Sequence, residues 1–171
     1  EMDPATTVFH YAQEIFEGMK CYRRKDGGLN LFRPRDNFAR MNRSAERMGM
    51  AVLPEGLFLE AVTRLVELER AWVPAGDGEQ SLYLRPFMVA SEPYLGVREA
   101  DTYRFAVIAT PAGPYYSEPV KLWITPNYTR AAPGGTGTAK CGGNYASSLI
   151  ATKEAAANGC GQVLWTDGAE H

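Results

Sequence analysis

Alternating polar and apolar residues mark the strands that we expect in the first half of the chain. Alternation over residues 19–23 and 29–32 is interrupted by Lys25-Asp26-Gly27-Gly28, a tetrapeptide typical of a tight turn. We therefore expect residues 15–32 to form a β-hairpin. Two later runs, 82–89 and 103–109, are rich in β-branched and aromatic residues and predict two more strands. Pro86 predicts an edge strand or a bulge, because proline has no amide hydrogen to donate.

Apolar residues spaced three and four positions apart predict a helix over residues 35–48. Its apolar stripe consists of Phe38, Met41, Ala45 and Met48. Gly49 is suited to end this helix. Arg43 and Arg47 lie off the stripe, on a face that we expect to be solvated.

A second helix is expected to begin at Pro54-Glu55 and to end before Pro74, with a loop at residues 75–78. Its broad apolar face consists of Leu57, Phe58, Ala61, Val62, Leu65, Val66, Leu68 and Trp72. Antiparallel strands combined with two helices predict an α+β unit over residues 1–111.

The second half of the chain has a different organisation. Three prolines and a glycine in residues 110–119 predict an interdomain linker, which we place at residues 112–119. We expect a second domain over residues 120–171. Strands are expected at 120–125 and 162–165, with a helix at 145–157 between them. We expect the strand at 162–165 to lack its sequential partner, so that this domain is incomplete and the 171-residue segment is inactive by itself.

Composition narrows the class of protein. The 171 residues carry 18 basic and 20 acidic side chains, which argues against a globally basic nucleic-acid-binding surface. No apolar run approaches the roughly 18 residues of a membrane span. Three widely spaced cysteines and two histidines suggest free thiols in a cytoplasmic protein and no metal site. Because the chain begins at Glu1, an organellar leader stays an open alternative.

A lysine within a glycine-rich stretch, residues 134–145, is the most informative chemical feature. A nucleotide P-loop would need glycine directly before Lys140 and serine or threonine directly after it, but Ala139 and Cys141 stand there. Glycines also let the backbone approach a flat cofactor, and a desolvated lysine becomes a nucleophile toward an aldehyde such as pyridoxal phosphate. By composition alone, an exposed loop lysine is the simpler interpretation.

Four ordered motifs resemble those of the branched-chain aminotransferases, which are class IV, fold-type IV enzymes dependent on pyridoxal 5'-phosphate. The motifs are Ala139-Lys140-Cys141-Gly142-Gly143-Asn144-Tyr145 with Ser147-Ser148-Leu149, His10-Tyr11 with residues 15–20, Tyr83-Leu84-Arg85-Pro86, and Arg130-Ala131-Ala132-Pro133. The resemblance implies a small α/β domain followed by a pseudo-barrel domain, cut short here. It also implies transamination of leucine, isoleucine or valine with 2-oxoglutarate.

The resemblance assigns roles residue by residue. Lys140 would bind the cofactor covalently and move a proton during the reaction, Tyr145 would hydrogen-bond the cofactor's phenolic oxygen, and Arg40 would bind its phosphate. The residues matching substrate-pocket positions are Tyr11, Phe16, Tyr83, Arg85 and Tyr128. Val97 lies in a segment that resembles a loop reaching the neighbouring subunit's pocket, which implies a homodimer.

Two kinds of alternative stay open at this point. Another fold-type IV enzyme, a D-amino acid aminotransferase or an aminodeoxychorismate lyase, would carry related motifs. A non-catalytic module that binds a phosphate ligand or nucleotide belongs to a different class. It would form no covalent adduct at Lys140.

Overall fold

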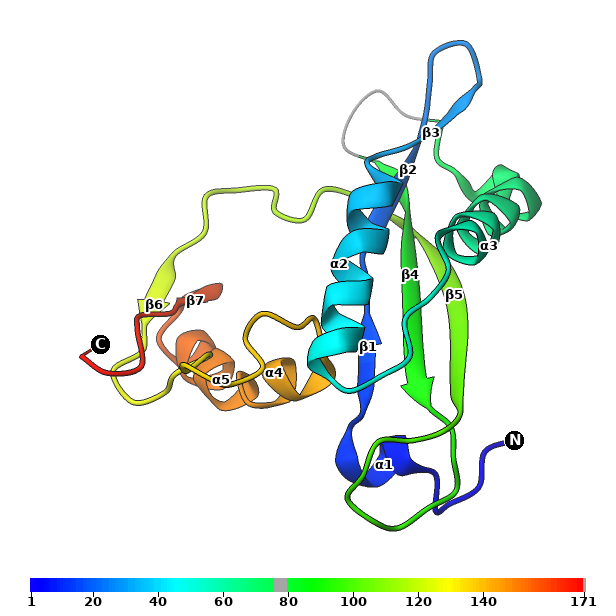
Figure 1. The fold of residues 1–171 in the computed structure, drawn as a ribbon. Coiled ribbons are helices and arrows are strands. Elements are labelled where there is room, and N and C mark those ends of the chain that lie inside the picture. Colours follow the sequence, from blue (N-terminus) through cyan, green and yellow to red (C-terminus); the bar gives the residue numbers. More distant parts are fainter. Residues whose placement is uncertain (76–79, 171) are drawn as a thin grey trace.

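A five-stranded antiparallel sheet with two long helices on one face forms the first part of the molecule (Figure 1). The computed structural model describes residues 1–75 and 80–170. The elements of this part are α1 (Thr7–Tyr11), β1 (Glu14–Phe16), β2 (Met19–Arg23), β3 (Leu29–Leu31), α2 (Pro34–Arg47), α3 (Glu55–Leu68), a short 3-10 turn (Arg70–Trp72), β4 (Ser81–Ala90) and β5 (Tyr103–Ala112). The expected loop at 75–78 lies largely outside the described residues.

Strand β4 is the centre of the sheet. β5 pairs with it along its whole length, while β2 and β1 pair with successive stretches of its other edge, and β3 lies outside β2. The prediction that Pro86 marks an edge or a bulge is therefore wrong. Pro86 lies between the stretches paired with β2 and β1, where its carbonyl accepts a hydrogen bond from the Glu17 amide. The missing amide hydrogen thus falls at a break in the ladder.

The expected hairpin is confirmed for β2 and β3, which pair antiparallel with Cys21 opposite Leu31. Gly27 in the turn has a φ of 81°, a conformation that glycine adopts at little cost. The start of the predicted hairpin needs correction, because Ile15 belongs to the separate strand β1. That strand pairs with β4 and leaves Glu17 and Gly18 as the connection to β2.

The core lies between the sheet and helices α2 and α3. Helix α2 agrees with the prediction to within one residue, and Gly49, at φ 61°, follows its end. The apolar face of α3 is narrower than expected, since Leu57, Leu68 and Trp72 are exposed. The fully or nearly fully buried side chains at this interface are Ile15, Met19, Cys21, Met41, Ala45, Phe58, Val62, Val66, Leu82, Leu84 and Met88.

The remaining elements form a second group beside β1 and α2 (Figure 1). They are β6 (Leu122–Ile124), α4 (Gly142–Ala146), α5 (Leu149–Ala157) and β7 (Gln162–Leu164). The single helix predicted at 145–157 is two helices, because the Ser147 and Ser148 hydroxyls bond to backbone carbonyls of the preceding turn. Strand β7 pairs in parallel with the earlier strand β6. The expectation that it lacks its sequential hairpin partner stays a prediction.

The segment between β5 and β6 differs slightly from the expected linker. Strand β5 continues to Ala112, three residues beyond the predicted strand end. Residues 113–121 contain no helix or strand. The division into two domains at this segment stays a prediction.

Candidate functional site

The side chain of Lys140 lies beside two aromatic rings that contact each other, and beside a hydroxyl group. Its Nζ atom donates a hydrogen bond of 2.6 Å to the Tyr145 hydroxyl. The same nitrogen lies 4.5 Å from the centre of the Phe16 ring and 4.9 Å from that of Tyr145. The two rings are 5.0 Å apart. An amine in such a setting can reach a flat ligand on an aromatic wall, with a hydrogen-bonding hydroxyl at hand.

Arg85 and Tyr83 lie next to this group, on the sheet face opposite the helices. Arg85 Nη2 donates a 2.8 Å hydrogen bond to the Tyr83 hydroxyl, and its guanidinium stacks 4.5 Å from the Phe16 ring. Both residues belong to β4 and are two positions apart, so their side chains share one face of the strand. Gly18 makes room for them, because a Cβ atom there would overlap the Tyr83 hydroxyl.

Arg40, on α2, is held by a carboxylate that is completely buried. Arg40 Nε and Nη2 donate hydrogen bonds of 2.6 and 2.7 Å to the two oxygens of Glu17. Asn37 donates a third bond, of 2.7 Å, to the same carboxylate. The hydrogen bond with Glu17 raises the pKa of the Arg40 guanidinium further, and the Tyr145 hydroxyl nearby acts in the same direction. Among the described residues, none accepts a hydrogen bond from Arg40 Nη1, so that group can bind a ligand anion.

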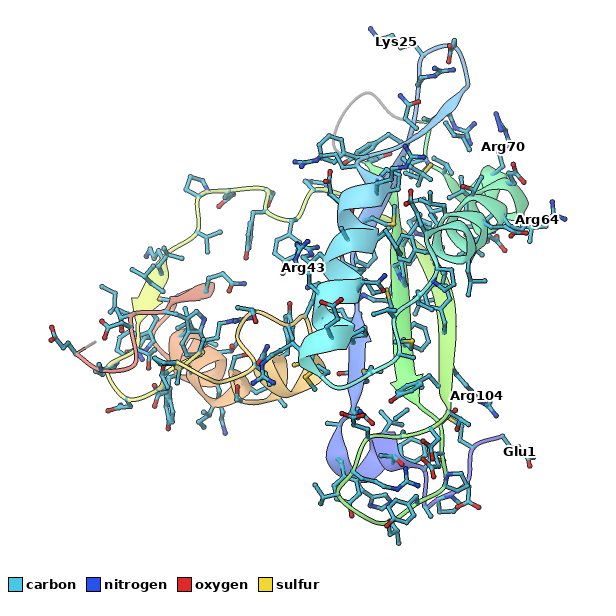
Figure 2. All side chains as sticks on the ribbon, in the orientation of Figure 1. Glu1, Lys25, Arg43, Arg64, Arg70 and Arg104 are labelled. Atoms are coloured by element: carbon cyan, nitrogen blue, oxygen red, sulfur yellow. The ribbon has the colours of Figure 1, made fainter. Side chains whose placement is uncertain are left out.

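The predicted solvated arginines behave differently from each other. Arg43 is exposed and projects from α2 on the side away from α3 (Figure 2). Arg47 is also exposed, but its Nη2 donates hydrogen bonds of 2.8 and 3.0 Å to the carbonyls of Gly134 and Gly135. The expectation of a merely solvated side chain is therefore incomplete for Arg47, which fastens the glycine-rich segment to α2.

Asn144 organises the backbone just before Lys140. Its side-chain amide donates hydrogen bonds of 2.8 Å to the carbonyls of Thr136 and Ala139, while its oxygen accepts one of 2.7 Å from the Thr136 hydroxyl. Asn144 is buried, as is Ala139. These bonds fold residues 136–144 into one compact turn that presents Lys140 toward Phe16.

An open pocket of about 550 Å³ lies along α2 and β2. Its lining includes Gly18, Lys20, Asn37, Arg40, Arg43 and Tyr83. Lys140 is not part of the lining, so this pocket borders the site at Arg40 and Tyr83 and does not contain all of it. Its basic side chains favour an anionic ligand.

Three predicted pocket residues lie apart from this group. Tyr128 follows β6, Tyr11 ends α1, and Val97 lies in the loop after β4, where it is 90% exposed. In the described part of the chain, none of the three has a hydrogen bond or ring contact with Lys140, Tyr145 or Arg40. The structure thus brings together Phe16, Arg40, Tyr83, Arg85, Lys140 and Tyr145.

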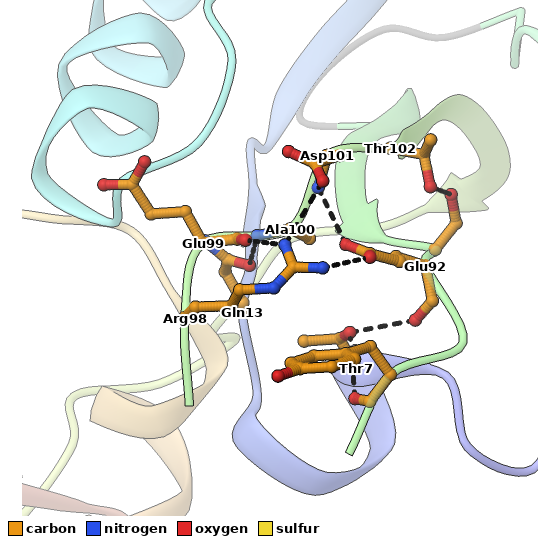
Figure 3. Close-up of polar contacts among 10 residues, drawn as sticks. Thr7, Gln13, Glu92, Arg98, Glu99, Ala100, Asp101 and Thr102 are labelled. Carbon is orange, nitrogen blue, oxygen red and sulfur yellow. Dashed lines mark hydrogen bonds and ion pairs between the residues drawn. The ribbon is translucent and has the colours of Figure 1, made fainter. Parts of the chain in front are cut away.

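The loop that carries Val97 is held in place by a polar network (Figure 3). Arg98 pairs with the carboxylates of Glu92 and Asp101. Gln13 accepts a 3.2 Å hydrogen bond from the Ala100 amide and donates to the carbonyls of Met48 and Gly49. These hydrogen bonds and ion pairs therefore fix the loop in a conformation that leaves its apolar residues exposed.

Sequence reasoning missed three polar residues that hold the site together. Glu17 anchors Arg40, while Glu14 and Ser44 contact the backbone around Lys140. Alternation along 14–19 carried a signal for the first of these. Glu17 shares the parity of the buried Ile15 and Met19, so its buried charge needs a hydrogen-bonding or ionic partner.

The chain is similar to known proteins over nearly its whole length. A family model for amino-transferase class IV matches residues 14–171. The branched-chain-amino-acid aminotransferase of Mycobacterium tuberculosis (strain H37Rv) is 52% identical over 99% of this chain and 47% of its own length. The probable branched-chain-amino-acid aminotransferase of Streptomyces coelicolor is 56% identical over 99% of this chain and 48% of its own length. The chain thus spans about half the length of these curated relatives.

Solved structures show the same arrangement of elements. The branched-chain aminotransferase from the thermophilic archaeon Thermoproteus uzoniensis, solved with norvaline, superimposes with a TM-score of 0.75 at 26% identity, covering 98% of this chain and 55% of that one. The branched-chain amino acid aminotransferase from Escherichia coli gives a TM-score of 0.74 at 27% identity, covering 98% and 53%. A further branched-chain amino acid aminotransferase, complexed with N-(5'-phosphopyridoxyl)-L-glutamate, gives a TM-score of 0.80 at 26% identity, covering 98% and 54%. These likenesses confirm the predicted fold class.

Proposed function

The chain belongs to the class IV aminotransferase family, and on that premise we propose that the full-length protein exchanges amino groups between branched-chain L-amino acids and 2-oxoglutarate. The proposed substrates are leucine, isoleucine and valine with their 2-oxo acids, together with glutamate and 2-oxoglutarate. The observation that carries the proposal is the amine of Lys140, 2.6 Å from the Tyr145 hydroxyl and stacked on Phe16.

The side chains fit the proposed cofactor, pyridoxal 5'-phosphate. Lys140 offers a primary amine for an aldehyde, Tyr145 a hydroxyl for a phenolic oxygen, and Arg40 an uncommitted Nη1 for a phosphate. When bound, the cofactor supplies the electron sink that stabilises a substrate carbanion. The residues that would hold it come from two separated segments, α2 with Arg40 and the turn with Lys140 and Tyr145, which the fold brings together.

Each residue has a distinct task in this proposal. The Lys140 amine would accept the proton that leaves the substrate Cα, a general-base role typically worth about 10²–10⁴-fold in rate. Tyr145 orients that amine through its hydroxyl. Glu17 keeps the Arg40 guanidinium fixed, so that binding phosphate requires little further ordering.

The proposed substrate side is where the Arg85 guanidinium lies against the Phe16 ring. Arg85, with the Tyr83 hydroxyl bonded to it, would bind the substrate carboxylate, while Phe16 supplies an apolar wall for a branched side chain. Tyr128 is proposed as a further wall residue. Its place after β6 allows this only if the loop around it approaches Arg85 in the complete protein.

We also propose a homodimer in which the loop carrying Val97 reaches the partner's pocket, and we propose Tyr11 as a further residue of the substrate pocket. Support comes from the exposure of this loop and from its bracing by Arg98 and Gln13. A rigid loop with exposed apolar residues is suited to contact a second subunit. Sedimentation of the full-length protein, alone and as Val97→Asp, tests this proposal, because the charge should dissociate the dimer and impair turnover together.

Domain organisation and cellular role belong to the same proposal. Residues 1–111 and 120–171 would belong to two domains joined by 112–119, the cellular location would be the cytoplasm, and the role would be branched-chain amino acid biosynthesis. Among the helices in the described ranges, none has the length and apolar character needed to cross a membrane. Fractionation of cells and growth of a deletion strain without branched-chain amino acids test the last two points.

A substrate panel tests the activity directly. Full-length protein loaded with pyridoxal 5'-phosphate is assayed with L-leucine, D-alanine and aminodeoxychorismate, each with 2-oxoglutarate as the acceptor where one is needed. Glutamate production from L-leucine, with little from D-alanine, supports the proposal. Preference for D-alanine or conversion of aminodeoxychorismate would replace it with the corresponding fold-type IV activity. A protein that binds the cofactor but turns over none of the three would be a binding module.

A further inference from the structure

The backbone around Lys140 is fastened to the first part of the molecule by three hydrogen bonds. The Phe16 amide donates to the Lys140 carbonyl at 3.0 Å, and the Lys140 amide donates to the Ser44 hydroxyl at 2.9 Å. The Gly142 amide donates to the carboxylate of Glu14. Lys140 lies outside any helix or strand, so these contacts with β1 and α2 decide where its side chain starts.

Ser44 connects the two groups proposed to bind opposite ends of the cofactor. Its side chain is completely buried, and its hydroxyl donates a 3.0 Å hydrogen bond to the Arg40 carbonyl while accepting the one from Lys140. A single hydroxyl group thus fixes the Lys140 backbone relative to the turn of α2 that carries Arg40. Alanine at position 44 would leave the Lys140 amide without this acceptor.

Glu14 reaches the segment from the other side. It lies on β1, on the same face as Phe16, and its carboxylate meets the first residue of α4, which lies beside β1 (Figure 1). A Cβ atom at position 142 would overlap Glu14 Oε1, so glycine at this position is what permits the contact. The only hydrogen bond of the Glu14 side chain within the described ranges is this one, and it takes part in no ion pair there.

We infer that Ser44 and Glu14 are positioning residues that set the location of the Lys140 amine by holding its backbone against α2 and β1. The inference rests on the function proposed above for Lys140. A rotation of the backbone at Lys140 is magnified along four side-chain carbons, and a displacement of about 1 Å at a reacting group can lower a rate roughly 10²-fold. Substrate binding through Arg85 does not depend on this backbone.

The expected signature separates positioning from general stability. In the full-length protein loaded with pyridoxal 5'-phosphate, Ser44→Ala and Glu14→Ala should each lower kcat for L-leucine about 10–100-fold. Ser44→Ala should leave KM nearly unchanged, because Ser44 lies on α2 and Arg85 on the opposite face of the sheet. The visible absorption band of the bound cofactor should titrate at a shifted pH in both variants. Glu14→Gln should behave nearly as the wild type, because an amide oxygen still accepts the Gly142 hydrogen bond.

A double-mutant cycle between Glu14 and Gly142 tests the same contact independently, so the inference can still be refuted if one variant folds poorly. Gly142→Ala pushes away only the end of a flexible side chain, so we expect it to fold and to reproduce the kinetics of Glu14→Ala. In a background that already carries Glu14→Ala, the added Gly142→Ala should have almost no further effect on kcat. Matched controls are Glu46→Ala on the exposed side of α2 and Ser117→Ala in the segment between β5 and β6, both with wild-type kinetics expected.

Each outcome decides the matter. Variants with a wild-type kcat and absorption titration, or additive effects of Glu14→Ala and Gly142→Ala, overturn the inference while the proposed function stands. A loss of activity that merely follows a lower fraction of folded protein, with an unshifted absorption titration, also overturns it. A wild-type protein that neither binds the cofactor nor converts leucine overturns the proposed function, and this inference falls with it.

Discussion

The side-chain amine of Lys140 lies 2.6 Å from the hydroxyl oxygen of Tyr145, five residues further along the chain. The pair spans the start of α4, so a short helical turn is enough to bring the two groups together. The Phe16 ring lies 5.0 Å from the Tyr145 ring and 4.5 Å from the Lys140 nitrogen, so a third side chain contacts both members of the pair.

The first prediction concerns this hydroxyl. Tyr145→Phe keeps the ring but removes the hydroxyl proposed to meet the cofactor's phenolic oxygen, a loss of about 0.5–1.5 kcal/mol for one hydrogen bond that corresponds to roughly 2–10-fold in kcat/KM for L-leucine. Steady-state assays of full-length protein measure it. Tyr115→Phe, on a tyrosine that is 80% exposed, is the matched control and should have no effect. An unchanged kcat/KM in Tyr145→Phe would show that the hydroxyl contributes nothing to turnover.

The second prediction separates Arg40 from Arg43. Arg40→Ala should weaken cofactor binding strongly and also lower stability by about 3 kcal/mol, because it leaves the buried Glu17 carboxylate without its ion-pair partner. Arg43→Ala should do neither. The double variant Arg40→Ala/Glu17→Gln should recover most of the stability but not the cofactor affinity. Cofactor titration and denaturant unfolding measure the two quantities, and equal losses in Arg40→Ala and Arg43→Ala would contradict the assignment.

The third prediction concerns the contact between Gly18 and Tyr83. Gly18→Ala should displace the Tyr83 hydroxyl and disturb the Arg85 guanidinium bonded to it, raising KM for L-leucine more than it lowers kcat. Gly56→Ala on α3 is the matched control, since a Cβ atom there meets nothing within 4 Å and alanine favours a helix. A wild-type KM in Gly18→Ala would argue against Arg85 and Tyr83 as the carboxylate site.

The fourth prediction is a pH dependence of stability at Glu14. Burial raises the pKa of its carboxyl above the ordinary 4.5, while the Gly142 hydrogen bond and the Arg85 charge act in the opposite direction. When the pKa of a carboxyl is higher in the folded protein than in the unfolded chain, protonation of that carboxyl favours the folded state. This contribution to stability is fully present below the pKa of the unfolded chain and is lost as the pH rises through the pKa of the folded protein. The unfolding free energy of Glu14→Gln, relative to wild type, should therefore increase from pH 4.5 toward neutrality and then level off.

Denaturant titrations at a series of pH values measure this difference. Glu46→Gln, at an exposed position of α2, is the control and should give a flat difference. A flat difference for Glu14→Gln as well would mean that burial does not disfavour the charged form of this carboxyl.

Local periodicity was enough to predict most of the fold. Helix α2 and strands β2, β3 and β4 follow directly from their apolar spacing and turn residues. The prediction for Pro86 was wrong because a central strand tolerates proline where no partner needs its amide hydrogen. Along the edge of β4, that place is set by where pairing with β2 stops and pairing with β1 starts, which depends on the register between distant segments. The break between α4 and α5 depends on two serine hydroxyls that compete with the helical backbone.

The site was predictable only where its members are neighbours along the chain. Tyr83 and Arg85 share a strand face, and Lys140 and Tyr145 share one turn, so sequence spacing already indicated their proximity. Contacts such as those of Ser44 with Lys140 join segments almost one hundred residues apart, and no local pattern specifies them. The resemblance assigned expected roles to Lys140, Tyr145 and Arg40, whereas Ser44 and Glu14, the proposed positioning residues, became visible only through their hydrogen bonds.

The central claim is that Lys140 is the residue that binds pyridoxal 5'-phosphate covalently. Borohydride reduction of the full-length protein loaded with the cofactor, followed by peptide mapping, tests it most directly. We predict a single reduced adduct on the peptide containing Lys140 and none in Lys140→Arg, whose guanidinium stays protonated and is a poor nucleophile. An adduct on Lys20, Lys25, Lys121 or Lys153 that spares Lys140 would contradict the account.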